Sequence, residues 1–347
     1  MNKKIAINGF GRIGRLAFRK LQNMPGVEVV AINDLTDNAT LAHLLKYDTA
    51  HGIFDFKIEH TPNSISVDGR RIAAYSEKDP AKLPWKDLGI DVVLECTGIF
   101  TSRAGVQPHL NAGAKRVIIS APVKGRDVKT IVIGVNDDEL SPEETIYSNA
   151  SCTTNCLAPI VKVIDQAYEI ISGSMTTVHA YTQDQRLQDA PHSDLRRARA
   201  AACNIVPTTT GAAKTVSQVY PNVSDKITAM SYRVPIITGS IVDLTVRTKK
   251  EAASVEEVNE VIKRAANGES MKHVLYYNED PIVSSDIVGN PYSSIFDAEL
   301  TSITDGLIRV VSWYDNEAGY ATRLAELAVM VANLGEVKVK SSAEMAV

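Results

Sequence analysis

A glycine pattern within the first fifteen residues is the feature that most constrains the fold. It reads Gly9-Phe-Gly-Arg-Ile-Gly14, with the apolar run Lys4–Asn8 before it and apolar residues at helical spacing over Arg12–Asn23 after it. A GxGxxG between a buried strand and a helix is typical of the phosphate-binding turn of a dinucleotide-binding βαβ unit. In such a turn Gly9 permits the tight bend, Gly11 lets the backbone approach a pyrophosphate, and Gly14 lets the helix pack closely on the strand. The helix N-terminus then offers N–H groups to the phosphates.

An acidic residue indicates which dinucleotide binds. Asp34 follows a second apolar run, Val27–Ile32, and lies 20 residues after Gly14. A carboxylate at this place accepts hydrogen bonds from a ribose diol and repels a 2′-phosphate. The sequence therefore predicts NAD rather than NADP. A glycine turn without a ligand is the alternative, and it is disfavoured because strand, glycines, helix and acid all fall in register.

The spacing of apolar runs predicts two kinds of sheet. In the first half, short apolar strands alternate with helices, one of them at Thr40–Lys46 with Thr40 as its expected N-cap. Buried strands separated by helices favour a parallel sheet covered on both faces, which is the doubly wound Rossmann arrangement of an α/β chain. The further strands expected there are Asp91–Leu94, Val117–Ser120 and Thr130–Ile133.

The second half has longer strands that mostly alternate or are rich in β-branched residues, with few crossovers. This pattern favours an α+β region with a mixed, mostly antiparallel sheet. The change of texture falls near Ser148–Thr153. The expected strands are Met175–Ala180, Ile227–Val234, Ile241–Thr248 and Leu307–Tyr314. The expected helices are Thr153–Gln166, Thr210–Val219, Ser254–Ala266 and Glu317–Leu334.

Composition narrows the class of protein. For 347 residues, a prior of about 150 residues per domain predicts two domains. The net charge of −4 gives no reason to expect a nucleic-acid or membrane-surface binder. We see no apolar stretch long enough for a membrane span, and the first residues lack the apolar core of a signal peptide. The cysteines are too few for a disulfide framework, so we expect a cytoplasmic location with reduced thiols. They are Cys96, Cys152, Cys156 and Cys203.

The segment Ser151-Cys-Thr-Thr-Asn-Cys156 carries the clearest chemical signal. It leads into the apolar helical run Leu157–Ile164, so Cys152 is expected at a helix N-terminus, where partial positive charge lowers the pKa of a thiol. A small buried residue is the plainer interpretation of Cys152. A zinc site is disfavoured, because the Cys-x3-Cys spacing has no second pair and no histidine cluster beside it.

His179 is the candidate base for this thiol. It lies near the end of the strand expected at Met175–Ala180, and histidine is suited to activating a thiol near neutral pH. A structural role is the alternative, because the chain has 7 histidines and spacing alone separates His179 only modestly from the others.

Three further features could bind anions. Ala180–Ala202 carries four arginines and three aspartates, so it is either a solvated, salt-bridged loop or an anion site. Thr208–Gly211 precedes a helical run whose first N–H groups could hold an oxyanion. Arg233 lies within an expected strand and needs a partner, which could be a phosphate.

Five segments together resemble the phosphorylating glyceraldehyde-3-phosphate dehydrogenases, over essentially the whole chain. The Ser-Cys-Thr-Thr-Asn-Cys segment is highly specific. Its occurrence together with the Trp-Tyr-Asp-Asn-Glu segment makes a chance match implausible. The five segments are Ile7-Asn-Gly-Phe-Gly-Arg-Ile-Gly-Arg15, Ala150-Ser-Cys-Thr-Thr-Asn-Cys156, His179-Ala-Tyr-Thr182, Leu195-Arg-Arg-Ala-Arg199 and Trp313-Tyr-Asp-Asn-Glu317.

The resemblance implies a reaction and its residues. The reaction is the oxidative phosphorylation of D-glyceraldehyde 3-phosphate to 1,3-bisphosphoglycerate with NAD+ and inorganic phosphate. It would run through a hemithioacetal and a thioester on Cys152, with His179 as base and Asn316 holding the nicotinamide amide. Further NAD contacts would come from Arg12, Ile13, Asp34 and Ser120. One anion site would use Ser151, Thr153, Thr210 and Gly211, the other Thr182 and Arg233, with Arg197 close to both.

The resemblance also implies an architecture. An NAD-binding domain would span residues 1–151 and a catalytic domain 152–316, with the C-terminal helix in 317–347 packing back on the NAD-binding domain. An S-loop at about 181–203 would cross a subunit interface in a homotetramer. No metal and no membrane contact are expected, and nucleic acid is not expected as the main partner.

Departures from the family pattern leave alternatives. Lys78 stands where the family often has Arg and cannot stack or fork as Arg does, so it is not among the expected site residues. The segment from Arg233 to Ser240 differs from the common pattern but keeps Arg233, and Pro191 matches the NAD-type S-loop. The alternatives are erythrose-4-phosphate dehydrogenase, which releases an acid by hydrolysis, an NADP-linked biosynthetic relative, and a binding protein on a retired enzyme scaffold.

Overall fold

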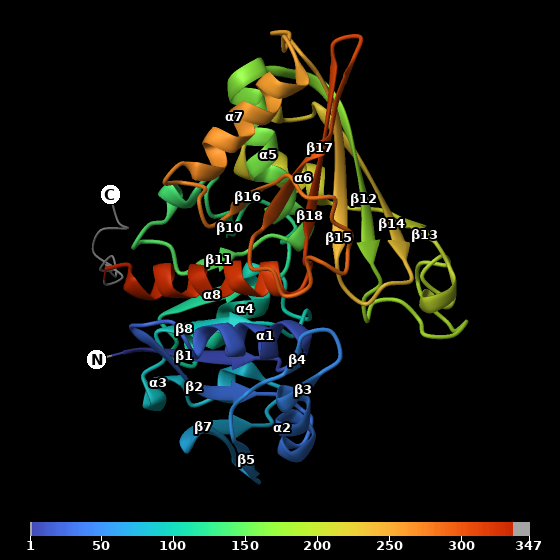
Figure 1. The fold of residues 1–347 in the computed structure, drawn as a ribbon. Helices are drawn as coiled ribbons and strands as arrows, with labels where there is room; N and C mark the ends of the chain where they lie inside the picture. The colour runs from blue at the N-terminus through green and yellow to red at the C-terminus, as the bar shows by residue number, and fades with distance from the viewer. Residues whose placement is uncertain (1, 336–347) are drawn as a thin grey trace.

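The computed structural model describes residues 2–335, which form two large sheets, one from each half of the chain (Figure 1). The first sheet has nine strands in the order β10-β11-β9-β8-β1-β2-β7-β6-β5. Strand β1 lies between β8 and β2 and is parallel to both, which confirms the predicted doubly wound arrangement. The strands are β1 (Lys3–Asn8), β2 (Val27–Asn33), β5 (Ile58–Thr61), β6 (Ser64–Val67), β7 (Arg70–Tyr75), β8 (Val92–Glu95), β9 (Arg116–Ile119), β10 (Lys129–Thr130) and β11 (Ile146–Ser148).

Successive residues of β1 point into two separate cores, because neighbouring side chains of a strand alternate between faces. Ile5 and Ile7 join the core under α1, α2 and α8, whereas Ala6 joins the core under α3 and α4. Both faces of the sheet are therefore covered. The helices are α1 (Arg12–Leu21), α2 (Asn38–Lys46), α3 (Trp85–Leu88), α4 (Arg103–Asn111) and α8 (Ala318–Asn333), and a small two-stranded sheet is formed by β3 (Tyr47–Asp48) and β4 (Gly52–Ile53).

One edge of the first sheet is antiparallel, which the sequence analysis did not predict. Strand β6 pairs antiparallel with β5 and with β7, while β7 is parallel to β2. Strand β5 is short and mostly exposed, so it carries almost no apolar alternation from which a strand could be recognised.

The second sheet has seven strands in the order β13-β14-β12-β15-β18-β17-β16. Two neighbouring pairs, β12 with β14 and β16 with β17, are parallel and the other pairs are antiparallel, which confirms the predicted mixed sheet. Strands β14 and β18 have the bounds expected from the sequence. The strands are β12 (Ile170–Ala180), β13 (Val206–Thr208), β14 (Ile227–Val234), β15 (Ser240–Thr248), β16 (Leu275–Asn278), β17 (Ser294–Thr304) and β18 (Leu307–Tyr314).

Three helices cover one face of this second sheet (Figure 1). Val161 of α5, Val216 of α6 and Ile262 of α7 are fully buried in one apolar core with Leu244 of β15. The helices are α5 (Cys152–Tyr168), α6 (Ala212–Val219) and α7 (Val255–Asn267), and single turns of 3-10 helix lie at Pro80–Lys82, Asp137–Glu139, Ala201–Cys203 and Pro221–Val223.

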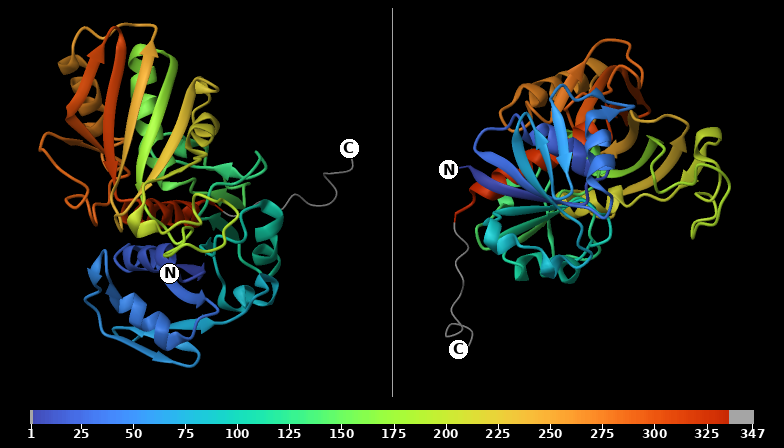
Figure 2. Two further views of the ribbon diagram at one scale, coloured as in Figure 1. Left: turned by 90° about the vertical axis from the view of Figure 1, so that its right-hand side faces the viewer. Right: turned by 90° about the horizontal axis from the view of Figure 1, so that it is seen from below.

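Helix α8 lies between the two sheets (Figures 1 and 2). Its apolar residues Leu324, Leu327 and Val331 are buried in the same core as Ile5 and Phe18 of the first sheet and α1. The chain thus returns to the N-terminal half after completing the second sheet. Residues 336–347 of the expected C-terminal helical segment lie outside the described residues.

Two local expectations are wrong. Asp37, not Thr40, caps α2: its Oδ1 accepts from the Thr40 backbone N at 2.9 Å. The strand expected at Thr130–Ile133 stops at Thr130, because the Asn136 side chain takes the place of a partner strand. Its Oδ1 accepts from the Val132 backbone N at 2.9 Å and its Nδ2 donates to the Thr130 carbonyl at 3.0 Å.

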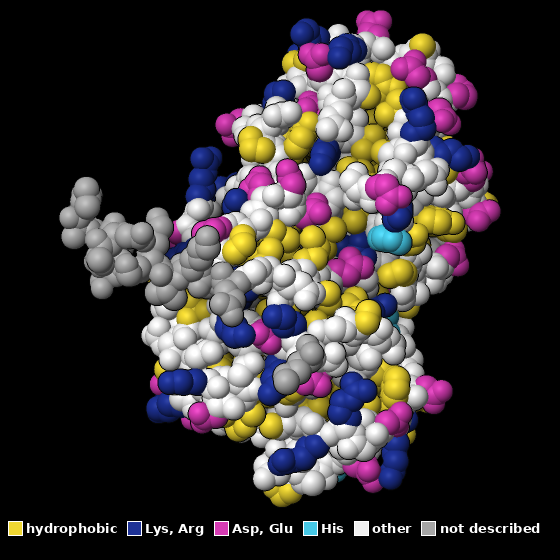
Figure 3. Space-filling view, turned by 90° about the vertical axis from the view of Figure 1, so that its left-hand side faces the viewer, with side chains coloured by type: hydrophobic (Ala, Val, Ile, Leu, Met, Phe, Trp, Pro, Cys, Tyr) yellow, Lys and Arg dark blue, Asp and Glu magenta, His cyan; other side chains and the backbone are white. Residues whose placement is uncertain are grey.

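The surface in Figure 3 carries acidic and basic side chains interspersed over the same face. Neither sign of charge dominates that face. Within residues 2–335, none of the helices combines the length and apolar character needed to cross a bilayer.

Candidate active site

Cys152 and His179 come together where the two sheets meet. Cys152 is the first residue of α5, and His179 is the penultimate residue of β12. The Cys152 Sγ lies 3.4 Å from the His179 Nε2. Ser151 caps α5 through its Oγ, which accepts from the Thr154 backbone N at 3.1 Å, and Ala150 before it has a φ of +57°. This tight turn places the thiol at the positive end of the helix.

The tautomer of His179 follows from its second nitrogen. Nδ1 lies 2.7 Å from the Ala180 carbonyl oxygen, which can only accept, so Nδ1 carries the proton. In the neutral ring, the Nε2 lone pair then faces the Cys152 thiol. Burial lowers the pKa of His179 to about 3, and the nearby Arg233 acts in the same direction. The ring is therefore a neutral base at physiological pH.

Opposing influences act on the thiol. Burial raises the pKa of Cys152, while the charge of Arg233 and hydrogen bonding from Thr153 lower it. The imidazole Nε2, 3.4 Å from the sulfur, is placed to accept the thiol proton. This is the arrangement of a nucleophile with its own general base.

Arg233 stands beside the pair on the neighbouring parallel strand. It is the register partner of His179 between β12 and β14. Its Nη1 donates to the Thr182 Oγ1 at 3.0 Å and to the Ala180 carbonyl at 3.2 Å, whereas its buried Nε has no partner among the described residues. A buried guanidinium with a spare donor is suited to attracting an anion.

The other residues predicted to bind anions lie in different parts of the site. Ser151 and Thr182 line the cavity that contains Cys152 and His179. Thr153 is buried, and its hydroxyl lies 2.9 Å from that of Tyr314.

Five of the seven predicted anion residues do not line this cavity: Thr153, Arg197, Thr210, Gly211 and Arg233. The guanidinium of Arg197 forms an ion pair with Asp184 and donates through Nε to the Thr208 hydroxyl at 2.9 Å. Helix α6 begins at Ala212 rather than Thr210, with Gly211 as its N-cap, and the Thr210 hydroxyl accepts from the Ala212 backbone N at 3.2 Å. Ion pairs of Arg197 with Asp184 and of Arg199 with Asp189 make Ala180–Ala202 a salt-bridged loop, one of the two alternatives for that segment.

Two adjoining cavities form a groove that leads from the thiol to the glycine turn. The cavity at Cys152 has a volume of about 720 Å³, and the next has about 630 Å³. Arg12, Ile13 and Gln183 line both. The first also contains Ser120 and Asn316, and the second contains Gly9, Gly11, Asp34 and Lys78. The predicted cofactor residues other than Gly14 therefore line one groove.

The glycine turn has the close contacts that the pattern requires. A Cβ on Gly14 would lie 2.2 Å from the Gly9 carbonyl oxygen, so this helix residue must be glycine. Gly9 has a φ of +89°, and its Cβ would meet the Thr97 backbone N at 2.6 Å. A Cβ on Gly11 would meet nothing within 4 Å, so the backbone there faces open space that a pyrophosphate can fill. The turn fits a dinucleotide.

The Asp34 carboxylate is fixed to this turn. Its Oδ2 accepts from the Phe10 backbone N at 2.7 Å, and its Oδ1 accepts from the Thr36 backbone N at 3.0 Å. A carboxylate held at the end of β2 faces the place where an adenine ribose lies in this kind of fold.

Asn316 is held by one end of its amide. The Oδ1 atom accepts from the Ser240 hydroxyl at 2.9 Å and from the Gly239 backbone N at 3.2 Å. The Nδ2 end is therefore the one available to a ligand in the cavity, where it can donate to a carbonyl oxygen.

Sequence reasoning missed several groove residues. Cys96 and Thr97 follow β8 directly and line the second cavity. Their position at the carboxyl end of a strand next to β1 was a usable signal, because ligands of open α/β sheets bind there. Tyr320 of α8 lines the first cavity, and no local pattern marks it. Lys78, which was left out of the expected site residues because the family often has Arg there, also lines the second cavity.

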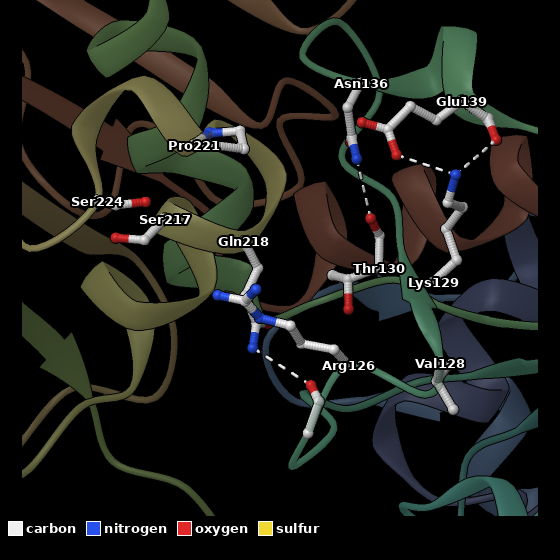
Figure 4. A pocket seen from close by; sticks show the side chains of 11 residues that line it. Arg126, Val128, Lys129, Thr130, Asn136, Glu139, Ser217, Gln218, Pro221 and Ser224 are labelled. Atoms are coloured by element: carbon white, nitrogen blue, oxygen red, sulfur yellow. Dashed lines mark hydrogen bonds and ion pairs between the residues drawn. The ribbon is translucent and has the colours of Figure 1, made fainter.

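A separate hollow of about 240 Å³ lies between the segment of Arg126 and Lys129 and the end of α6 (Figure 4). Lys129 is ion-paired with Glu139 at 3.1 Å, and Gln218 donates to the Gly125 carbonyl at 3.3 Å. Among the residues that line this hollow, no nucleophile contacts a base. The Cys152 cavity is therefore the candidate active site.

Comparisons with known proteins agree with this geometry. The family model described as glyceraldehyde 3-phosphate dehydrogenase, NAD binding domain, matches residues 3–103, and that described as glyceraldehyde 3-phosphate dehydrogenase, C-terminal domain, matches residues 151–316. The chain is 58% identical over 326 residues to the glyceraldehyde-3-phosphate dehydrogenase of Thermotoga maritima, covering 93% of this chain and 97% of that protein. The enzyme of the same name from Borreliella burgdorferi is 54% identical over 331 residues, covering 94% and 98%. That from Geobacillus stearothermophilus is 52% identical over 337 residues, covering 96% and 100%.

Proposed function

The chain belongs to the glyceraldehyde-3-phosphate dehydrogenase family and is an NAD-dependent oxidoreductase, and we propose that it makes 1,3-bisphosphoglycerate from D-glyceraldehyde 3-phosphate and inorganic phosphate. The family and the cofactor predicted from the sequence are thereby confirmed. The observation that carries the proposed chemistry is the contact of 3.4 Å between the Cys152 Sγ and the unprotonated Nε2 of His179.

The first step forms a carbon–sulfur bond. As the Cys152 Sγ attacks the aldehyde carbon, its proton passes to the His179 Nε2. The aldehyde oxygen gains negative charge, which the Cys152 backbone N–H at the start of α5 and the imidazolium stabilise. Return of the proton from His179 to this oxygen gives a neutral hemithioacetal and restores the base.

The second step oxidises the hemithioacetal to a thioester. His179 removes the hydroxyl proton while the C–H bond loses a hydride. NAD+ bound along the groove supplies the hydride acceptor. The Asn316 Nδ2 is suited to hold the carboxamide of the cofactor, and the Gly9–Gly14 turn its pyrophosphate, with Arg12, Ile13 and Ser120 lining the path between them.

The third step needs a second anion. Inorganic phosphate attacks the thioester carbon, the C–S bond breaks, and Cys152 leaves as the thiolate with an acyl phosphate as product. The thiolate then takes back the proton that His179 removed in the second step, which restores the thiol and the neutral base. The substrate phosphate and the attacking phosphate require two sites. We assign Thr182 and Arg233 to one, and Ser151, Thr153, Thr210 and Gly211 to the other. Arg197 would serve both after exchanging its Asp184 partner for a phosphate.

Phosphate dependence tests this proposal. The formation of NADH is followed at 340 nm from glyceraldehyde 3-phosphate and NAD+, with and without inorganic phosphate. Sustained turnover that requires phosphate supports the acyl-phosphate product. Steady turnover without phosphate means that water hydrolyses the thioester, which contradicts the proposal and favours the erythrose-type reaction.

We propose a homotetramer as the working form. The segment 181–203 exposes large apolar side chains, with Leu187 79% and Leu195 81% exposed in the single chain. Leaving such side chains in water is unfavourable, and a subunit contact would bury them. Sedimentation equilibrium gives the mass of the assembly, and a stable monomer at micromolar concentration would contradict this assignment. We also propose that the NAD-binding domain ends at residue 151, that the catalytic domain begins at residue 152, and that the protein is cytoplasmic.

A further inference from the structure

A cluster of five charged side chains joins α1, the β3–β4 turn and the start of α8. The cluster consists of Arg12, Asp48, His51, Asp315 and Glu317. Arg12 donates through Nη1 to Asp48 at 2.6 Å and through Nε to Glu317 at 2.8 Å. His51 lies 2.9 Å from Asp315 through Nε2 and 3.4 Å from Asp48 through Nδ1. The side chains of His51, Asp48 and Asp315 are at least nine-tenths buried.

Asp315 is the point at which this cluster joins the second sheet. Its Oδ1 accepts from the Thr238 hydroxyl at 2.7 Å and from the backbone N of Glu317 at 2.9 Å. Its Oδ2 accepts from the Gly289 backbone N at 2.7 Å and from His51. One carboxylate thus ties together the β14–β15 loop, the loop before β17, the start of α8 and the β3–β4 turn.

His51 supplies the contact from the N-terminal half. Both ring nitrogens face carboxylates, so the doubly protonated ring satisfies both contacts. Burial opposes this charge, but hydrogen bonds to Asp315 and Asp48 outweigh it and raise the pKa of His51 to about 9. The Glu317 carboxylate lies 3.8 Å away, and the Arg12 Nη2 lies 3.5 Å from Nδ1. From α1, Lys20 adds positive charge near Asp315.

The cluster touches the cofactor groove at two places. Asn316 follows Asp315 directly and lines the cavity with Cys152, while Arg12 lines both cavities at their junction. A displacement of Asp315 would move the backbone of Asn316. A change at Glu317 would leave the Arg12 guanidinium with Asp48 in place of its two carboxylate partners, and so would loosen its position.

We propose that His51 is a positioning residue for NAD+: its charged contact with Asp315 holds the segment 315–317, and through it the Asn316 amide and the Arg12 guanidinium, in the geometry that binds the cofactor. This inference rests on the proposed function, since it uses the assignment of Asn316 to the carboxamide of the cofactor. His51 does not touch the reacting atoms. The loss of its charge therefore weakens cofactor binding and leaves the reactivity of Cys152 unchanged.

The test compares His51→Gln with the full wild-type chain and with His43→Gln. Glutamine keeps a hydrogen-bond donor near Asp315 but no charge, and His43 is an exposed histidine on the adjacent α2. The dissociation constant of NAD+ is measured by calorimetric titration from pH 6.5 to 10. At pH 7.5, His51→Gln is expected to weaken binding about tenfold, the scale of one charge-assisted hydrogen bond, with His43→Gln unchanged.

The pH profile separates positioning from a general loss of structure. In the wild type and in His43→Gln, affinity should fall as the pH rises through about 9, whereas His51→Gln should show no such fall. The rate of Cys152 alkylation without NAD+ should be equal in all three. A wild-type-like profile for His51→Gln overturns the proposal, and so does a parallel loss of alkylation rate, which would indicate a disturbed fold. Because this readout needs no glyceraldehyde 3-phosphate, failure of the phosphate-dependence test would leave it interpretable.

A double-mutant cycle gives a second, independent test. If His51 acts through Asp315, His51→Gln combined with Asp315→Asn should weaken NAD+ binding no more than the more harmful single substitution. Additive losses would mean that the two residues act separately, which contradicts the proposed contact. Thermal unfolding of each variant identifies any protein that is not folded at the assay temperature.

Discussion

The Ser240 hydroxyl donates to the Asn316 Oδ1 at 2.9 Å and accepts from the Ala180 backbone N at 3.1 Å. The carbonyl of the same residue, Ala180, fixes the tautomer of His179. One hydroxyl group therefore connects the residue whose carbonyl orients the base with the amide assigned to the cofactor. The positions of Ala180 and of the Asn316 amide are thus coupled through a fully buried side chain.

Ser240→Ala should disturb the cofactor end of this connection. Without this donor, the Asn316 Oδ1 loses its shortest hydrogen bond and keeps only the longer contacts from the Gly239 backbone N at 3.2 Å and the Thr238 hydroxyl at 3.4 Å. We expect the KM for NAD+ to rise about fivefold and the free energy of unfolding to fall by about 1 kcal/mol, the value of one buried hydrogen bond. Steady-state kinetics and denaturant unfolding measure both. Ser217→Ala on α6 is the control, and an equal KM in the two variants would contradict the role of Ser240.

Cys152→Ser should abolish dehydrogenase activity while NAD+ binding is retained. A serine hydroxyl is a far weaker nucleophile than a thiol at neutral pH, and its reaction with the aldehyde cannot lead to a thioester. NADH formation at 340 nm and NAD+ titration are measured together. Cys203→Ser is the matched control, because Cys203 is an exposed free thiol away from the groove. Normal turnover by Cys152→Ser would disprove the assignment of the nucleophile.

His179→Asn should slow the chemistry and the alkylation of Cys152. The buried thiol loses its acceptor, and burial alone raises the pKa of Cys152. We expect kcat to fall about 10²- to 10⁴-fold, as for the loss of a general base. Alkylation at neutral pH should slow, with reactivity recovered only at more alkaline pH. An alkylation rate equal to that of the wild type would exclude a working thiol–imidazole pair.

His51 and His179 should affect stability with opposite dependence on pH. The pKa of His51 is raised to about 9, so its contribution is complete below about 6.5, the pKa of an unperturbed histidine, and is lost as the pH rises through 9. The pKa of His179 is lowered to about 3, so the unfolded chain binds the extra proton first and the folded state loses stability as the pH falls from about 6.5 toward 3. Urea unfolding at a series of pH values measures both.

Single substitutions assign these effects. The stability difference between wild type and His51→Gln should be largest below about pH 6.5 and vanish above about pH 9. His179→Asn should become less sensitive to acid than the wild type between pH 6.5 and 3. Parallel stability curves for wild type and either variant would contradict the corresponding prediction.

Sequence patterns predicted the parts of the molecule in which one residue type is sterically or chemically required. Only glycine fits at position 14, because a Cβ there would lie 2.2 Å from the Gly9 carbonyl oxygen. The glycine pattern therefore predicted the turn without a structure. The strands Ile227–Val234 and Leu307–Tyr314 were recovered with their bounds. The role of each site residue stays a prediction, because a distance between two side chains does not measure the rate or the binding that either one contributes.

The patterns failed where a distant side chain decides the local structure. Asn136 ends β10 by bonding the backbone around Thr130, which no window of apolar residues reveals. The pairing of His51 with Asp315 depends on two segments that only the fold brings together. Tyr320 reaches the groove because α8 returns between the sheets, which local spacing also does not encode.

Asp34→Gly should erode the preference for NAD+ over NADP+. The substitution removes the carboxylate that repels a 2′-phosphate and accepts from a ribose diol, so the affinity for NAD+ falls relative to the affinity for NADP+. The substitution also removes the acceptor for the Phe10 backbone N, which loosens the glycine turn and weakens both cofactors alike. The ratio of kcat/KM for the two cofactors is therefore the informative quantity, and a fall of about tenfold or more is expected from the loss of one charged contact. Asp37→Asn is the control, because it removes a neighbouring carboxylate that caps α2 outside the groove. An unchanged ratio in Asp34→Gly would mean that Asp34 shapes the turn but does not read the ribose.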